Sequence, residues 1–302
     1  MDQATGLRSL VEDHMAEHKS PQASLKRASG TDHAPKQIRV ISVTSGKGGV
    51  GKTSVVANLA LALGRMGQRV LVLDADLGLA NLDVMLGLNP RYTIDHLLRG
   101  EKRLEEILIT GPGGFKLLPA ASGIPELTDL DNSQRLLLLD ELDALKDRFD
   151  VLLIDTGAGI SSNVMYFNYA ATEKIVLVTN EPTSLTDAYA LIKVLTSRYQ
   201  QKRFKVLVNA ARNAEEANHI YRHLSLVVDQ FLGSPSLDYL GWIPFDRQMP
   251  AAVRKQKTVI EQFPKSEASR QLLNLAKTLI ANHDALLLEG DIRFFWQKFL
   301  EH

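Results

Sequence analysis

Residues 45–54 read SGKGGVGKTS, a glycine-rich stretch whose lysines and hydroxyl group could bind phosphate. The pattern Gly-x-x-x-x-Gly-Lys-Thr is typical of a loop whose backbone N–H groups surround phosphates while Lys52 reaches them and Thr53 holds Mg²⁺. A strand-like run, IRVISVT, precedes the stretch, and a helical run, TSVVANLALALGRM, follows it, as a phosphate loop requires. The predicted loop consists of Gly46, Lys47, Gly48, Gly49, Val50, Gly51, Lys52, Thr53 and Ser54.

The same letters also match a dinucleotide-binding fingerprint. In that interpretation Gly46-x-Gly48-x-x-Gly51 forms the turn, and Asp74, at the end of the next apolar run, binds a ribose. A dinucleotide site needs neither a lysine nor a threonine after the last glycine, so the phosphate loop is the better interpretation. The sequence lacks the Asn-Lys-x-Asp motif that selects guanine, which favours ATP as the nucleotide.

Acidic side chains end two further apolar runs. Asp74 and Asp76 lie in LVLDADLGLANLD, and Asp155 lies in LLIDTGAG, where glycines follow it. The carboxyl ends of parallel strands meet at one sheet edge, and carboxylates there commonly hold Mg²⁺ through water. Asp74 and Asp155 could instead only cap the turns that follow them. Because three such strand ends are expected at one edge, we predict a Mg²⁺ site formed by Thr53, Asp74 and Asp155.

Lys47 has no role in this scheme. A second lysine would crowd Lys52 if both bound the same phosphates, so Lys47 could instead reach a nucleotide held by a partner, as an arginine finger does in trans. The alternative is a solvated loop charge. With this lysine, KGGVGKT is the deviant Walker A signature, and the chain resembles the MinD/ParA family over residues 38–285.

This resemblance implies an ATPase that forms a homodimer around ATP and Mg²⁺. It implies that Lys47 acts across the dimer, that Asp76 orients the attacking water and that Asp155 binds magnesium through water. Asn209, at the end of FKVLVNA, would read the adenine, with Pro244 of IPFD beside the ring. An Asn in such a position is also often only a turn residue. The complete set of expected catalytic residues argues against an inactive binding module.

The rest of the chain predicts the elements that position these residues. From Gln37 onward, short apolar runs rich in β-branched residues alternate with helical periods. Continuous apolar strands joined by helices predict an α/β fold with a doubly wound, mostly parallel sheet and helices on both faces. The resemblance implies the same fold, a P-loop NTPase of the MinD/ParA type.

Composition narrows the class of protein. The 302 residues contain 35 basic and 35 acidic side chains, so no net charge attracts the chain to nucleic acid or membrane. The absence of cysteine excludes disulfides and thiolate metal sites. No apolar signal stretch begins the chain, and no run approaches the ~18–20 apolar residues of a membrane span. We therefore expect a soluble, cytoplasmic protein.

We expect three parts along the chain. Residues 1–37 form a flexible polar extension that begins with a short DQATGLR helix, residues 38–285 form the ATPase domain, and residues 286–302 form an amphipathic helix. A helical apolar stripe binds a membrane interface or packs on the protein's own core, and the resemblance favours the membrane. The stripe comprises Ile292, Phe295, Trp296, Phe299 and Leu300.

Within the family, the chain looks most like the flagellar-number regulators known as FlhG or FleN. The runs DADLGLANLD, EPTSLTDAYALIK and DQATGLR carry this resemblance, and the absence of cysteine excludes the iron–sulfur members. It implies slow, regulatory hydrolysis, residues 1–20 binding an FlhF-type GTPase, and contact with a flagellar master transcription activator. It also implies ATP-controlled attachment to the inner face of the cell membrane, a pole included. A MinD-type division-site or a ParA-type DNA-partition ATPase is the alternative.

A basic cluster could form a DNA-binding patch of the partition type. Cations favoured by the dipole at a helix end are the commoner explanation, so we do not expect direct nucleic-acid binding. The cluster comprises Lys193, Arg198, Lys202, Arg203, Lys205 and Arg212.

Overall fold

The computed structural model divides the chain into two units, Met1–Pro35 and Lys36–His302, and all the elements named below belong to the second unit. The expected N-terminal extension and the C-terminal helix with its five apolar residues lie outside the described part of the chain. The structure describes residues 38–76, 82–119, 137, 141, 144–233 and 235–281.

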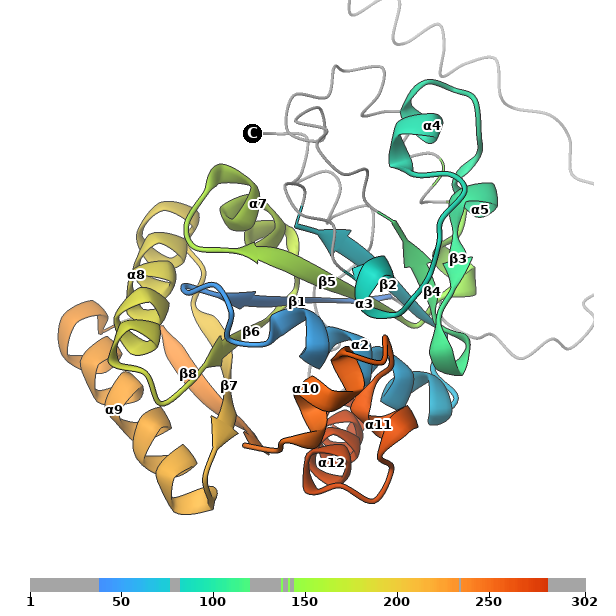
Figure 1. Cartoon of the computed structure of the whole chain (residues 1–302). Helices are drawn as coiled ribbons and strands as arrows, with labels where there is room; N and C mark the ends of the chain where they lie inside the picture. The colour runs from blue at the N-terminus through green and yellow to red at the C-terminus, as the bar shows by residue number, and fades with distance from the viewer. Residues whose placement is uncertain are drawn as a thin grey trace, which may run out of the picture. The chain divides into compact units, whose positions relative to one another are not determined.

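One sheet of eight strands organises the domain, in the order β3-β4-β2-β5-β1-β6-β7-β8 (Figure 1). Every pairing is parallel except β3 with β4, which is antiparallel at one edge. This confirms the predicted mostly parallel sheet. The strands are β1 Arg39–Ser45, β2 Val70–Ala75, β3 Ile109–Thr110, β4 Lys116–Leu118, β5 Val151–Ala158, β6 Glu173–Val178, β7 Arg203–Ala211 and β8 Ser236–Pro244.

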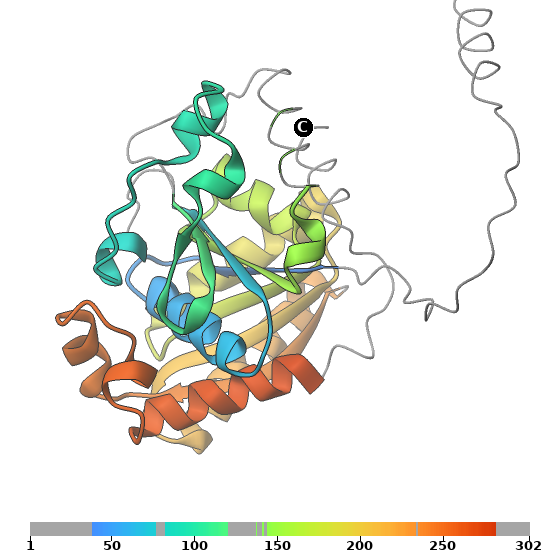
Figure 2. The same ribbon diagram turned by 90° about the vertical axis from the view of Figure 1, so that its right-hand side faces the viewer.

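Helices cover both faces of this sheet. On one face the sheet packs against α2 (Lys52–Arg65), which lies beside α12 (Glu267–Ala281) in Figures 1 and 2. The opposite face carries α7 (Ser162–Ala170), α8 (Pro182–Tyr199) and α9 (Ala214–Leu232). The shorter helices are α3 Leu82–Met85, α4 Ile94–Leu98, α5 Leu104–Ile107, α10 Gln248–Val253 and α11 Val259–Gln262, with 3₁₀ turns at Pro112–Gly114 and Lys146–Arg148.

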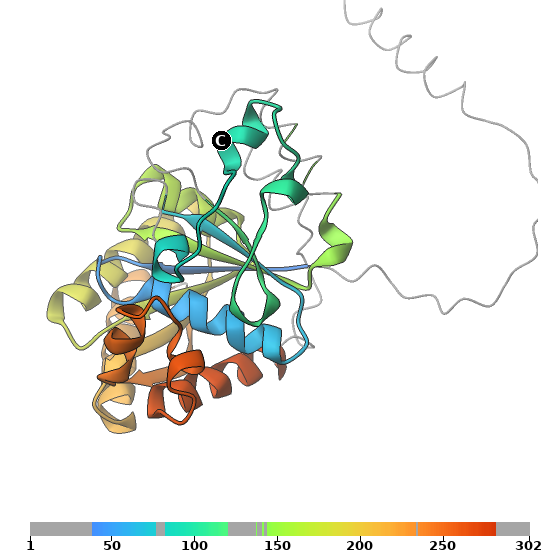
Figure 3. The same cartoon turned by 45° about the vertical axis from the view of Figure 1, so that its right-hand side comes forward.

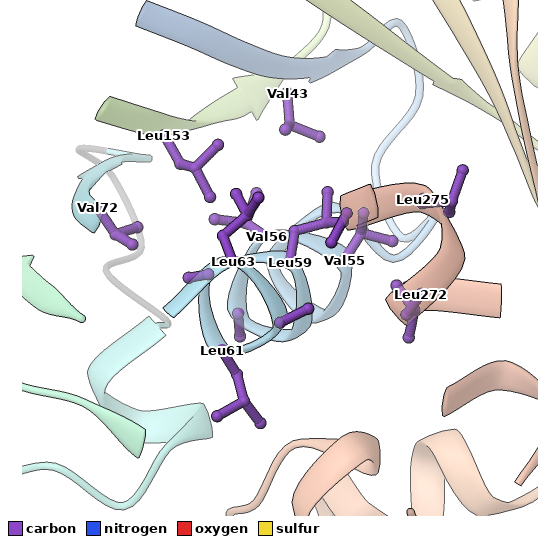
Figure 4. Packing of buried hydrophobic residues seen from close by; sticks show 14 of the residues in the cluster. Val43, Val55, Val56, Leu59, Leu61, Leu63, Val72, Leu153, Leu272 and Leu275 are labelled. Atoms are coloured by element: carbon purple, nitrogen blue, oxygen red, sulfur yellow. The ribbon is translucent and has the colours of Figure 1, made fainter. Parts of the chain in front are cut away.

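The helix α2 is buried on nearly all sides, and this burial fixes the position of its first turn. Val55, Val56 and Leu59 face the sheet and α12, where they meet apolar side chains such as Val43 and Leu272 (Figure 4). Burying each Val or Leu stabilises the fold by about 1.5–3 kcal/mol. A large part of the core therefore holds α2 and the loop before it. The helices α10, α11 and α12 lie on the side of α2 that faces away from the sheet (Figure 3).

None of the helices that the structure describes is both long enough and apolar enough to pass through a bilayer.

Candidate nucleotide site

The loop between β1 and α2 depends on glycine at three positions. Gly49 and Gly51 have φ of 77° and 95°, a left-handed backbone that other residues rarely adopt. A Cβ on Gly46 would lie 2.1 Å from the backbone carbonyl of Asp187 in α8. The sequence motif thus reflects two demands, one on backbone conformation and one on close packing against a neighbouring helix.

The first turn of α2 presents its N–H groups toward the loop. Gly51 precedes the helix, no side chain caps it, and its first turn contains no acidic residue. Free N–H groups and the helix dipole together favour an anion at such an end. The loop and α2 therefore have a geometry that suits a bound anion such as phosphate.

Lys52 is buried in this turn, with only 8% of its surface exposed. Burial lowers the pKa of its ammonium group, and the negative charges of Asp155 and Asp76 oppose that shift. The side chain thus lies among carboxylates at the base of the loop. A phosphate there would add the negative charge that stabilises its charged form.

Thr53, Asp74 and Asp155 meet beside Lys52. Asp74 and Asp155 are opposite each other in the pairing of β2 with β5, and Thr53 hydrogen-bonds to the Asp155 carboxylate. Asp74 also accepts hydrogen bonds from the backbone N–H groups of Asp76 and Leu82, at 3.2 Å and 3.1 Å. The three residues predicted as a metal site therefore come together at one edge of the sheet.

Asp155 is almost completely buried, with 1% of its surface exposed. Burial and then the charge of Asp74 raise its pKa to about 7. Among the described residues, no group donates a hydrogen bond to its Oδ1 atom. An orphaned carboxylate oxygen beside a second carboxylate and a hydroxyl fits a hard divalent cation such as Mg²⁺. The described part of the chain holds no cluster of three or more His, Cys, Asp or Glu that could bind a metal ion.

Asp76 lies near the residues that follow Asp155. Its carboxylate faces Gly157, since a Cβ on that glycine would approach Asp76 Oδ1 to 3.5 Å. Asp76 is thus close to the segment that follows Asp155, where a water-orienting carboxylate is expected. Residues 77–81, which follow it, lie outside the described residues.

Lys47 is not a free solvated charge in this structure. Its Nζ atom forms an ion pair with Glu181 and donates a hydrogen bond to Thr183 Oγ1 at 2.9 Å. Both partners belong to the start of α8 in the same chain. Sequence reasoning missed Glu181 and Thr183 because 134 and 136 residues separate them from Lys47. Their only sequence signal is a position just after an apolar strand.

Asn209 contacts the phosphate loop directly. Its Nδ2 atom donates to the Val50 carbonyl oxygen at 2.7 Å, and a Cβ on Gly51 would lie 2.6 Å from the same atom. Pro244 lies on the neighbouring strand, opposite Ala211. The residues predicted to surround adenine therefore end adjacent strands beside the loop, and Asn209 is more than a turn residue.

Two members of the basic cluster lie at opposite ends of the strand β7. Lys205 is paired with Glu173 near the start of its strand, at 2.5 Å, whereas Arg212 follows the other end of that strand and pairs with Glu216 at 3.7 Å. Two of the six cations thus already have acidic partners at different edges of the sheet.

Apolar side chains lie exposed around the nucleotide edge. Val84 and Val253 line a cavity of about 340 Å³ together with Met85, Gln256 and Thr53 of the phosphate loop. Ile160, just after the Asp155 segment, is also exposed. Such residues around a polar site suit coverage by another protein surface.

Comparisons with known proteins agree with this geometry. The family described as "AAA domain" matches residues 38–207. The chain is similar to the antiactivator FleN of Pseudomonas aeruginosa, with 43% identity over 88% of this chain and 94% of that protein. It is also similar to the flagellum site-determining protein YlxH of Helicobacter pylori, with 32% identity over 87% and 90% of the two chains. Among solved structures, the septum site-determining protein MinD of Pyrococcus horikoshii, complexed with Mg-ADP, has a TM-score of 0.66 and 26% identity over 83% of this chain and 98% of that chain.

Proposed function

This chain belongs to the MinD/ParA family of P-loop ATPases, and from that premise we propose that it is an ATP-operated switch that regulates flagellar number and placement. The observation that carries the proposal is the similarity to FleN over nearly the whole of both chains. YlxH, whose name also refers to flagella, supports the same assignment. In this role slow, Mg²⁺-dependent hydrolysis would act as a timer for the ATP-bound state.

Nucleotide binding would use the residues that meet at the sheet edge. The loop backbone and Lys52 would hold the phosphates, while Thr53 and Asp155, with Asp74 behind them, would hold Mg²⁺ partly through water. The bound cation would supply positive charge against the phosphates. Asp76 would orient the attacking water, and Asn209 with Pro244 would flank the adenine. The MinD neighbour that carries Mg-ADP supports this choice of ligands.

The proposed active form is a homodimer. Lys47 would leave Glu181 and Thr183 and reach a nucleotide held by the second copy, where its charge would offset that of the transition state. The exposed apolar residues beside the loop, Val84, Val253 and Ile160, support a partner surface at this edge. The contacts of Lys47 within its own chain would then belong to the monomeric, resting state.

The remaining parts of the proposal concern segments outside the described residues. We propose that residues 1–20 bind an FlhF-type GTPase and that the protein restrains a flagellar master transcription activator. The stripe Ile292, Phe295, Trp296, Phe299 and Leu300 would attach the ATP-bound dimer to the inner face of the cell membrane. The protein would otherwise be cytoplasmic, and a cell pole would be one place of attachment.

Deletion of the gene tests this function directly. Flagella would be counted and minicells scored in the deletion strain, with the wild-type gene and a Lys47→Ala gene returned as complements. We expect extra or misplaced flagella, corrected by the wild-type gene and not by Lys47→Ala. Normal flagellation in the deletion strain would refute the proposal.

A MinD-type division-site function is the second candidate, because solved MinD structures share this fold at TM-scores near 0.65. It predicts minicells with normal flagella in the same deletion strain. The pairing of Lys205 and Arg212 with acids gives a ParA-type DNA patch less support.

A further inference from the structure

A buried polar network joins β1 to α7 behind the nucleotide site. Asn168 Oδ1 accepts a hydrogen bond from Ser42 Oγ at 2.9 Å, and its Nδ2 atom donates to Thr44 Oγ1 at 3.0 Å. The same Nδ2 atom donates to the carbonyl oxygen of Val164 in its own helix at 2.7 Å. Ser42, Thr44 and Asn168 are all completely buried. Both N–H groups of the amide and its oxygen are therefore satisfied inside the protein.

Two more bonds connect the same strand to the segment after Asp155. Thr156 Oγ1 donates to the Val43 carbonyl oxygen at 3.1 Å, and the Gly159 N–H donates to the Ser45 carbonyl oxygen at 3.0 Å. Each residue of β1 from 42 to 45 thus bonds to the chain between Thr156 and Asn168. The phosphate loop begins directly after this stretch of β1.

Polar side chains are unusual at this position. Central strands of a parallel sheet are covered on both faces and are normally apolar throughout. Replacing both partners of a buried hydrogen bond by apolar groups of the same shape is often neutral or stabilising. Stability alone therefore does not explain the network. A fully satisfied set of hydrogen bonds holds α7 and β1 in one relative position, whereas two apolar surfaces could shift slightly against each other.

We infer that Ser42, Thr44 and Asn168 fix the position of α7 along β1, which makes Asn168 a positioning residue for ATP hydrolysis. This inference rests on the proposed ATPase function. The network fixes the position of α7, and α7 in turn fixes the segment that connects Asp155 to its first turn. A shift of that segment moves Gly157, which faces Asp76, relative to the phosphate loop, while Asp155 stays held by the pairing of β5 with β1 and β2. Small misplacements of this kind reduce the rate of the chemical step more than substrate binding.

The test replaces the whole network by apolar side chains that add no bulk, in the full chain, as Ser42→Ala/Thr44→Val/Asn168→Leu. We expect a folded protein whose Tm equals or exceeds that of the wild type and whose KM for ATP changes less than ~3-fold. Its kcat should fall about tenfold or more, which corresponds to ~1.4 kcal/mol of activation free energy. If the triple variant does not fold, Thr44→Val/Asn168→Leu, which replaces both partners of one bond and leaves Ser42 Oγ donating to the Glu173 carbonyl oxygen at 3.4 Å, should lower kcat with a nearly unchanged Tm.

Two variants serve as controls. Thr44→Ser keeps the hydroxyl group to which Asn168 donates and should retain the wild-type kcat. Thr172→Val removes a hydroxyl that donates to the same strand at the Val40 carbonyl oxygen, 2.8 Å away, beyond the end of α7. This variant should also retain the wild-type kcat.

Hydrogen–deuterium exchange of residues 156–161, measured without nucleotide, gives a readout independent of turnover. We expect faster exchange in the apolar variant than in the wild type. An unchanged kcat in the folded variant, a decrease in kcat that only follows a lower Tm, or unchanged exchange would overturn the inference. A wild-type protein without ATP turnover would count against the proposed function, and exchange alone would then decide the role of the network.

Discussion

Lys47 and Lys52 lie five positions apart and have opposite surroundings. Lys52 is buried among carboxylates at the base of the loop, whereas Lys47 is one-third exposed and paired with Glu181. Because Lys52 is buried at the base of the loop, it can interact only with the nearby carboxylates and with a ligand bound in the loop. Lys47 can exchange its partner at low cost, because an ion pair at the protein surface contributes only about 0–1 kcal/mol. We therefore expect the two lysines to respond differently to changes in their neighbours.

The first prediction concerns the ion pair of Lys47. Glu181→Ala releases the lysine, so the ATP-bound dimer should form at a protein concentration up to about fivefold lower than in the wild type. Analytical sizing with ATP and Mg²⁺ over a concentration series measures this. Glu105→Ala is the matched control, because Glu105 is equally exposed and paired with Arg148. Equal dimerisation of both variants and the wild type would contradict a resting role for the Glu181 pair.

The second prediction concerns the pKa of Asp155, which burial and Asp74 raise to about 7 from 3.8. Between these two values the folded protein holds a proton that the unfolded chain has lost, so this group's contribution to stability falls as the pH rises through about 4 to 7. Without nucleotide and metal, Asp155→Asn should raise Tm at pH 8 by at least ~2 °C and much less at pH 5.

Thermal unfolding in EDTA at both pH values checks this result, with exposed Asp238→Asn as the control. Addition of Mg²⁺ and ATP should reverse the order at pH 8, because a ligand that binds only the wild type stabilises only the wild type. The same difference in Tm at pH 5 and pH 8 would show that Asp155 does not carry the raised pKa.

At the scale of elements, the site is a junction of β1, α2 and α8. The loop leaves β1, passes against the backbone of α8 at Asp187, and enters the buried α2. Because α2 and α8 lie on opposite faces of the sheet, the loop crosses its edge between them. Close packing on both sides is what fixes the loop's conformation.

The third prediction concerns this packing of the loop. Gly46→Ala places a Cβ 2.1 Å from a backbone carbonyl, so the loop and α8 must separate. We expect a loss of about 1–3 kcal/mol of stability and a large loss of ATP affinity. Gly48→Ala is the matched control, because its Cβ would lie 3.9 Å from its nearest neighbour and should leave Tm nearly unchanged. Thermal unfolding and nucleotide titration of both variants decide the outcome. A stable, ATP-binding Gly46→Ala protein would contradict the packing argument.

At the scale of the whole molecule, the described domain begins and ends at the same edge of the sheet. Arg39, the first residue of β1, donates through Nη1 to the carbonyl oxygen of Leu279 in the last turn of α12, at 2.7 Å. The same arginine pairs with Glu173, which also binds Lys205. This partly buried network joins the two ends of the domain at the edge opposite the phosphate loop.

The fourth prediction concerns membrane attachment through residues 290–302. With ATP, the full chain should pellet with anionic liposomes more strongly than with ADP, because two helices in one dimer bind cooperatively. The helix sequence contains Arg293 and Lys298 as cations, each contributing only ~1 kcal/mol, so a single copy should bind weakly. Deletion of 290–302 should abolish pelleting.

Trp296→Glu/Leu300→Glu should act like the deletion, because it places charges in the apolar stripe. Gln297→Glu, which places a charge on the polar side, should bind nearly as well as the wild type. Equal pelleting of the full chain with ATP, the full chain with ADP and the deletion variant would refute membrane attachment.

The sequence by itself determined the fold class and the phosphate loop. Apolar β-branched runs can be read along the chain because parallel strands are buried on both faces, and β1 and β2 confirm this. Gly46, Gly51 and Lys52 could be predicted because a phosphate loop makes local demands on backbone and charge. Thr53, Asp74 and Asp155 could be placed together because the ends of parallel strands share an edge.

Only the tertiary structure decided which distant side chains meet these residues. The pair of Lys47 with Glu181, the bond from Asn209 to Val50, and the network of Ser42, Thr44 and Asn168 join positions more than 120 residues apart. Nothing in the local sequence specifies such a contact, because it depends on the order of strands in the sheet and the seating of helices upon it. A hydroxyl in a strand has the same letter whether it faces solvent or a buried amide, and only packing separates the two cases.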